Sequence, residues 1–258
     1  MRILLTNDDG YQSPGLRAIR DELRKFGEVT VAAPEREQSG VSSSLTLYQP
    51  IIVKEHEFDG VRTFAVAGTP ADAVKLALTE FLDEPPHLVV SGINFGLNTG
   101  PNILYSGTCA GALEAAQAGH TSVALSLQVS THPEWPAVAK LAARLTMDIV
   151  DAYPQSASVF NVNIPAVPVK RLKGRVVTRQ EPMPWIDTFE QRKDPRGRTY
   201  FWLKGREPRA RAPESGEIPT DAHAVQEGFV SITPIHRDLT AEDLLGGLKR
   251  LVERKKQR

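Results

Sequence analysis

The sequence opens with Arg2-Ile3-Leu4-Leu5-Thr6, a short apolar run that leads directly into Asn7-Asp8-Asp9-Gly10. An apolar run of this length, bounded by turn-forming Asn, Asp and Gly, is typical of a buried strand that ends at a loop. A helix is expected next, because Ser13 can cap it, Pro14 suits its first turn, and apolar residues follow at helical spacing as far as Phe26. A strand, a polar loop and a helix in this order predict the start of an α/β sheet.

The same alternation continues along most of the chain. Several of the later strands are apolar throughout, which is typical of parallel strands covered on both faces. The sequence therefore predicts an α/β fold with a mostly parallel sheet and helices on both faces of the sheet. Further strands are expected at Val29–Ala33, Ile51–Lys54, Thr63–Ala67, Leu88–Ser91, Ser122–Leu127 and Val159–Val162, and helices at Thr69–Leu82, Gly107–Ala118 and Trp135–Ala152.

The pattern changes from Glu181 to Pro219, a stretch rich in Pro, Arg and Gly with one strand-like run at Thr199–Leu203. We expect an extended arm here, followed by a late strand at Phe229–Thr233. Thr240 is expected to cap a C-terminal helix, with Asp243 three residues on as in a capping box. Residues 1–258 are interpreted as a single domain, with a core at about 1–180 and the arm and C-terminal segment at about 181–258.

The charge balance and the cysteine content exclude several classes of protein. Thirty-one basic residues balance 31 acidic ones, which argues against a general binder of nucleic acid polymers. The single cysteine, Cys109, excludes a disulfide framework and fits a reducing compartment. No apolar run approaches 18 residues, and the N-terminal run is too short for a signal peptide. A soluble, cytoplasmic protein without a membrane span is therefore expected.

Two adjacent acids, Asp8 and Asp9, follow the first strand at the edge where α/β sheets bind ligands. Neighbouring carboxylates repel each other, and a divalent cation with a preference for oxygen ligands, Mg²⁺ or Mn²⁺, relieves that repulsion. A solvated turn is the alternative, because Asn, Asp and Gly are common turn residues. The residues alone leave both interpretations open.

Two later loops carry further polar groups to the same edge. Asn94 and Asn98 offer amide oxygens for a metal or N–H donors for a phosphoryl oxygen, although locally bonded turn asparagines are the alternative. Ser106, Gly107 and Thr108 open a helix of small residues, where hydroxyls and free N–H groups form an anion site; simple capping by Ser106 is the alternative. The dinucleotide, P-loop and Gly-x-Ser-x-Gly motifs are all absent from the expected positions.

Taken in order, these loops resemble the SurE family of survival-protein nucleotidases over almost the whole chain. The arm matches the family weakly. The resemblance rests on Asn7–Gly10, Ala33-Pro34 with Gln38–Gly40, Gly68–Asp72, Val89–Asn94 with Gly96 and Asn98, Tyr105–Thr108, Asn161–Pro165, and Thr220-Asp221 leading into Gly228–Pro234.

The resemblance implies a Rossmann-like fold and a metal-dependent phosphomonoesterase that acts on nucleoside 5'-monophosphates. Nucleoside 3'-monophosphates and short polyphosphates are further candidate substrates. It also implies one Mg²⁺ or Mn²⁺ per subunit, and a homodimer or homotetramer formed through the C-terminal segment and an extended β-hairpin. Carried over by motif, the metal ligands are Asp8, Asp9, Ser39 and Asn94.

The implied catalytic residues are Asp8, Asp9 and Asn98, and the phosphoryl group would be held by Asn98, Ser106 and the backbone of Gly107 and Thr108. The nucleophile is expected to be water activated by the metal, with attack by an aspartate as the alternative. An unrelated aspartate-nucleophile phosphatase fits less well, because it would need a second acid two residues after the first. A nucleotide- or phosphate-binding regulator without turnover remains the competing hypothesis.

Overall fold

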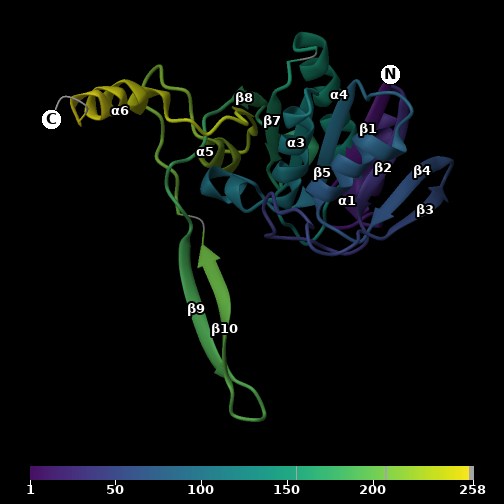
Figure 1. Ribbon diagram of the computed structural model, residues 1–258, viewed down its shortest axis with the longest axis horizontal. Helices are drawn as coiled ribbons and strands as arrows, with labels where there is room; N and C mark the ends of the chain where they lie inside the picture. The colour runs from purple at the N-terminus through teal and green to yellow at the C-terminus, as the bar shows by residue number, and fades with distance from the viewer. Residues whose placement is uncertain (155, 207, 256–258) are drawn as a thin grey trace.

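The computed structural model describes residues 1–154, 156–206 and 208–255, and within them one large sheet organises the chain (Figure 1). Its strand order is β3-β4-β2-β1-β5-β6-β7-β11-β8, with pairs parallel from β4 through to β7. The strands are β1 (Arg2–Thr6), β2 (Glu28–Pro34), β3 (Val53–Phe58), β4 (Val61–Val66), β5 (Leu88–Phe95), β6 (Ser122–Leu127), β7 (Val159–Ile164), β8 (Arg175–Val177) and β11 (Val230–Ile235). The predicted mostly parallel sheet is confirmed.

Helices cover both faces of this sheet, as predicted. Alternate residues of β1 point to opposite faces, so Ile3 and Leu5 join a core with Leu16 and Ala139, whereas Leu4 packs in a separate core with Val74. The first face carries α1 (Pro14–Leu23) and α4 (Trp135–Ala152). The second carries α2 (Pro70–Leu76), the π-helical turn Ala77–Phe81 and α3 (Gly107–Gln117). The remaining helical elements are the 3₁₀ segments Gly100–Leu104 and Val169–Arg171 and the helices α5 (Asp221–Gln226) and α6 (Glu242–Lys255).

Capping residues start the helices of the core where the sequence predicts. The side chains of Ser13, Thr69 and Ser106 accept N–H bonds from the first turns of α1, α2 and α3. Thr69 and Asp72 complete a capping box. These caps fix the residue at which each preceding loop ends and its helix begins.

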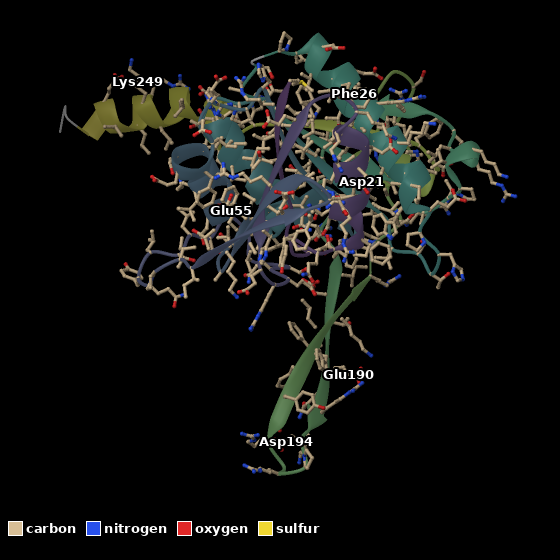
Figure 2. The ribbon with its side chains drawn as sticks, turned by 90° about the vertical axis from the view of Figure 1, so that its right-hand side faces the viewer. Asp21, Phe26, Glu55, Glu190, Asp194 and Lys249 are labelled. Carbon is tan, nitrogen blue, oxygen red and sulfur yellow. The ribbon has the colours of Figure 1, made fainter. Side chains whose placement is uncertain are left out.

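Two predicted helix boundaries are wrong. The first helix ends at Leu23, and Phe26 lies beyond it with 41% of its surface exposed (Figure 2). The chain must leave the helix here because Glu28 N donates to Met1 O at 2.9 Å, and a side chain at Gly27 would overlap that carbonyl. The C-terminal helix begins at Glu242, so Thr240 does not cap it; Thr240 N donates instead to the Asp238 carboxylate at 2.8 Å.

An antiparallel hairpin and the C-terminal helix extend from the sheet (Figure 1). The hairpin consists of β9 (Ile186–Lys193) and β10 (Thr199–Arg206), and Figure 2 shows its Glu190 and Asp194 far from Asp21 on α1. The predicted arm is therefore present, with a strand that the sequence analysis missed at 186–193. In the part of the chain that the structure describes, no helix is both long and apolar enough to cross a membrane.

Candidate active site

Loops from separate parts of the sequence meet at the carboxyl ends of β1, β2 and β5 and line an open cavity of about 260 Å³. Because parallel strands end at the same edge of a sheet, the loops that follow them are brought together there. Six of the predicted site residues line this cavity: Asp8, Asp9, Ser39, Asn94, Asn98 and Ser106. The cavity is also lined by Glu37, Gly40, Phe95, Leu97, Asn102 and Tyr105.

Asp8 is held by the start of α3. The Thr108 hydroxyl and the Thr108 backbone N–H both donate to the Asp8 carboxylate, and Asp8 is only 3% exposed. A Cβ on Gly107 would lie 2.7 Å from the Asp8 Cβ, so this close approach requires glycine. The positive end of the α3 dipole therefore faces the Asp8 carboxylate.

The placement of Gly107 and Thr108 differs from that of the other predicted phosphate ligands, since neither lines the cavity. Thr108 is completely buried, and its hydroxyl bonds to Asp8. Within this structure Thr108 orients a carboxylate, and Gly107 provides the space for that contact.

Burial raises the pKa values of both carboxyl groups above the usual value. The pKa of Asp9 rises to about 6, first because of burial and then because of the neighbouring Asp8 charge. The pKa of Asp8 also rises through burial, although the Thr108 hydrogen bonds oppose the rise. Glu37 adds to the increase at both sites. The ionised pair is therefore unfavourable unless positive charge compensates it.

Ser39 reaches the cavity because its loop is tied back onto the sheet edge. Gln38 N donates to Asp8 O at 2.7 Å, and Ser42 donates from Oγ to Leu104 O at 2.6 Å and from N to Tyr105 O at 3.1 Å. Ser39 Oγ itself donates to Glu37 Oε1 at 2.8 Å. The long loop after β2 thus lies over the end of β1.

The two asparagines are held in different ways. Asn94 Nδ2 donates to Gly96 O at 2.8 Å, which leaves the Asn94 amide oxygen as an acceptor at the cavity. A shift in the β5–β6 register immediately precedes Asn94. Asn98 is 6% exposed, and its Nδ2 donates to Ser126 Oγ at 2.8 Å.

The donor atoms suit a hard divalent cation. Asp8, Asp9, Ser39 and Asn94 offer only oxygen, which Mg²⁺ and Mn²⁺ prefer. No group of three or more His, Cys, Asp or Glu that could hold a metal occurs among the described residues, so a cation here would need the neutral oxygens of Ser39 and Asn94 as well. The donor set and the crowding of the two carboxylates therefore fit a cation.

Comparisons with known proteins identify the family to which the chain belongs. The family described as SurE, survival protein SurE, matches residues 3–187. The chain belongs to the SurE family. It is 41% identical to the 5'-nucleotidase SurE of Syntrophus aciditrophicus, over 98% of this chain and 95% of that protein. It is 45% identical to the protein of the same name from Rhodopirellula baltica, over 96% and 98% of the two chains.

A solved structure shows the same family fold. The crystal structure of the SurE protein from Aquifex aeolicus superposes with a TM-score of 0.82 at 37% identity. The match covers 97% of this chain and 99% of the Aquifex aeolicus chain, so it includes the arm and the C-terminal segment. The predicted SurE resemblance is thereby confirmed over nearly the whole sequence.

The sequence analysis assigned no role to several residues that line the cavity. Glu37 lies two positions before Ser39 in the same loop and adds a third acid to the cavity. Phe95 and Tyr105, at 37% and 64% exposed, place aromatic rings at its wall. Tyr105 belongs to the motif Tyr105–Thr108, Phe95 directly follows Asn94, and Glu37 lies in the loop that carries Ser39, but the sequence analysis gave none of the three a role.

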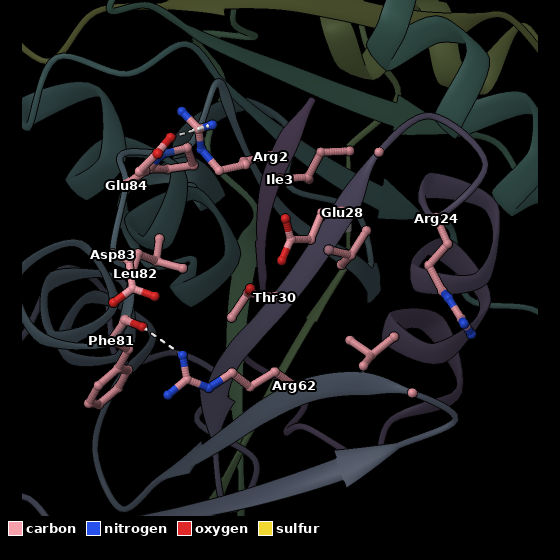
Figure 3. A pocket seen from close by; sticks show the side chains of 15 residues that line it. Arg2, Ile3, Arg24, Glu28, Thr30, Arg62, Phe81, Leu82, Asp83 and Glu84 are labelled. Carbon is pink, nitrogen blue, oxygen red and sulfur yellow. Dashed lines mark hydrogen bonds and ion pairs between the residues drawn. The ribbon is translucent and has the colours of Figure 1, made fainter.

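A second hollow, of about 490 Å³, lies at the opposite edge of the sheet near the start of β1 (Figure 3). Arg2 pairs there with Glu84 at 2.6 Å, and Arg62 donates to Phe81 O at 3.1 Å and to Glu55 at 2.6 Å. The guanidinium groups of Arg2 and Arg62 therefore already have hydrogen-bond and ion-pair partners within the protein. The loops that carry the SurE motifs do not reach this hollow.

The raised pKa of Asp9 predicts a pH-dependent stability for the metal-free protein. The folded state holds this proton more tightly than the unfolded state, so stability should fall as pH rises from about 4 to about 6. Asp9→Asn should therefore stabilise the protein at pH 8 by about 1–2 kcal/mol, allowing for solvent screening, and have little effect at pH 4. Urea unfolding in excess chelator measures both values.

Asp83→Asn, an exposed acid at the other edge of the sheet, is the matched control and should show no such pH-dependent difference. If Asp9→Asn and the wild type had the same free energy of unfolding at pH 8, the interpretation that ionised Asp9 destabilises the folded protein would be contradicted.

Proposed function

We propose that this chain is a metal-dependent phosphomonoesterase that hydrolyses nucleoside 5'-monophosphates to nucleoside and phosphate. The observation that carries the proposal is the convergence of Asp8, Asp9, Ser39, Asn94, Asn98 and Ser106 on one cavity. Membership of the SurE family supports it, since curated relatives at 41–45% identity are named 5'-nucleotidase.

Asn98 and Ser106 are the proposed ligands of the phosphoryl oxygens. Ser106 Oγ caps α3 by accepting Cys109 N–H at 3.0 Å, which leaves its own proton free to be donated. The Asn98 amide has a second N–H besides the one that bonds Ser126. Donors fixed in this way stabilise the charge that develops on phosphoryl oxygens in the transition state.

Asp8, Asp9, Ser39 and Asn94 would hold one Mg²⁺ or Mn²⁺ per subunit. When bound, such a cation polarises a phosphoryl oxygen and lowers the pKa of water. Among the described residues, Asp9 Oδ1 receives no hydrogen bond, whereas Asp9 Oδ2 accepts Phe95 N–H at 3.2 Å. Asp9 Oδ1 is therefore the proposed acceptor of one proton from the attacking water. As the bond from the water oxygen to phosphorus forms, the phosphorus–oxygen bond to the nucleoside breaks, and the leaving nucleoside oxygen takes up a proton from solvent. Attack by a carboxylate itself is less favoured at Asp8, which Thr108 holds in place.

Metal removal tests the proposal directly. Excess chelator should abolish phosphate release from AMP, and Mg²⁺ or Mn²⁺ should restore it. Asp8→Asn and Asp9→Asn should lose most activity while remaining folded, because each removes a charge from the cation site. Asp83→Asn should keep full activity. Activity that persists in chelator after metal loss is confirmed by elemental analysis would exclude metal dependence.

The phosphate ligands are tested separately. Asn98→Ala and Ser106→Ala should lower kcat on the order of 100-fold, equivalent to about 3 kcal/mol, because each loses a fixed donor. The metal concentration that gives half-maximal activity should stay unchanged, since neither residue is a proposed metal ligand. Steady-state kinetics with metal titration provides both numbers, and normal kcat in both variants would place the phosphate site elsewhere.

The competing hypothesis is a nucleotide-binding regulator without turnover, and the same assay separates the two. A protein that binds AMP in calorimetry but releases no phosphate with any divalent metal would be the regulator. A panel that includes nucleoside 3'-monophosphates and short polyphosphates defines the range of substrates.

We also propose that the chain assembles as a homodimer or homotetramer. Phe189, Phe201 and Leu203 lie on one face of the β9–β10 hairpin and are 67%, 58% and 63% exposed. An isolated two-stranded hairpin is marginally stable in water, so a neighbouring subunit is needed to cover this face. The exposed leucines of α6, Leu244, Leu248 and Leu251, form a second uncovered apolar surface.

Light scattering at micromolar concentration should therefore give at least twice the mass of one chain. Replacing Phe201 and Leu203 with Glu should lower that mass, because charges on the hairpin face disfavour its burial. A monomeric wild type would overturn the assembly proposal and leave the proposed enzymatic activity unaffected.

A further inference from the structure

Three polar side chains, Ser126, Asn161 and Asn163, lie completely buried on the neighbouring strands β6 and β7. Ser126 pairs with Asn163 in the sheet register, and Asn161 lies two residues earlier on β7, so all three share one face. Buried polar groups are unfavourable unless they form hydrogen bonds. All three form them with a single residue, Asn98.

Asn163 bonds to the Asn98 backbone at two points. Asn98 N donates to Asn163 Oδ1 at 2.8 Å, and Asn163 Nδ2 donates to Asn98 O at 3.1 Å. The side-chain amide therefore pairs with a backbone unit as an adjacent strand would. Such a two-point contact fixes the orientation of Asn98 as well as its position.

Two further contacts complete the support of Asn98. Asn161 Nδ2 donates to the same Asn98 carbonyl at 2.7 Å. Asn98 Nδ2 donates a hydrogen bond to Ser126 Oγ at 2.8 Å. Side chains of β6 and β7 thus form hydrogen bonds with the backbone N–H, the backbone carbonyl and one side-chain N–H of Asn98. Asn98 also lines the cavity.

We propose that Asn163 and Asn161 are positioning residues for phosphate ester hydrolysis, acting through Asn98. The inference rests on the proposed function for the role of Asn98 as a phosphoryl ligand. Fixed donors accelerate a reaction only when they are held where charge develops, and a displacement of about 1 Å can cost about 100-fold in rate. Asn161 and Asn163 on β7, together with Ser126 on β6, fix Asn98 in this way.

The test compares Asn163→Ala and Asn161→Ala with the wild type on AMP and Mn²⁺. We expect kcat to fall about 10- to 100-fold at temperatures where each variant is fully folded by circular dichroism. The metal concentration for half-maximal activity should not change. Ser231→Ala is the matched control, because Ser231 is buried, pairs with Asn163 across β7 and β11, and has no hydrogen-bond partner for Oγ among the described residues. It should keep the wild-type kcat.

A double variant separates positioning from a general structural role. If Asn163 acts through Asn98, then Asn98→Ala combined with Asn163→Ala should be no slower than Asn98→Ala alone. Two losses that multiply would overturn the proposal. Should Asn163→Ala fail to fold, Asn163→Ser retains a small polar group at the position and is compared in the same cycle.

Binding of inorganic phosphate gives a readout that does not depend on turnover. In calorimetry with Mg²⁺ present, Asn163→Ala should weaken phosphate binding when Asn98 is intact and have no effect in the Asn98→Ala background. A wild type that binds phosphate without hydrolysing AMP would refute the proposed function and leave this test valid. A folded Asn163→Ala variant with normal kcat and normal phosphate affinity would refute the positioning role alone.

Discussion

The contact between the start of α3 and the end of β1 is the constraint on which the rest of the site depends. Asp8 follows a strand in the centre of the sheet, and Gly107 allows the helix to approach its carboxylate without a side chain between them. Thr108 then fixes that carboxylate with its hydroxyl and its backbone N–H. The loops after β2 and β5 can close around Asp8 because its position is set in this way.

The packing around Asp8 and Asp9 also changes the pKa values of their carboxyl groups. Burial raises the pKa values of both adjacent carboxyl groups, the Asp8 charge raises the pKa of Asp9 further, and Glu37 raises both. The fold holds these carboxyl groups close together although their negative charges repel each other. Such strain is common at functional sites, where a substrate or an ion supplies the compensating interaction. The all-oxygen donor set fits the hard cation that we propose for this site.

Neutral amides form another wall of the cavity. Asn98 is held by side chains of β6 and β7, so the carboxylate wall and the amide wall are both anchored in the same sheet. The loop that carries Asn98 is also linked to the arm through Asp221. Gly100 N donates to the Asp221 carboxylate, which also accepts the backbone N–H of Glu181 at the start of the arm. The buried Asp221 carboxylate therefore connects the loop of Asn98 to the base of the hairpin by hydrogen bonds.

The sequence by itself determined the strand at Arg2–Thr6, the helix starts at Ser13, Thr69 and Ser106, and the family, because strand patterns, caps and motifs act within a few residues. It also supplied six residues that line the cavity. Only the tertiary structure decided that Thr108 bonds to Asp8, that Glu37 joins the acids, and that Asn161 and Asn163 hold Asn98. Those contacts join residues up to 100 positions apart, so they depend on the order of strands in the sheet, which no local pattern encodes.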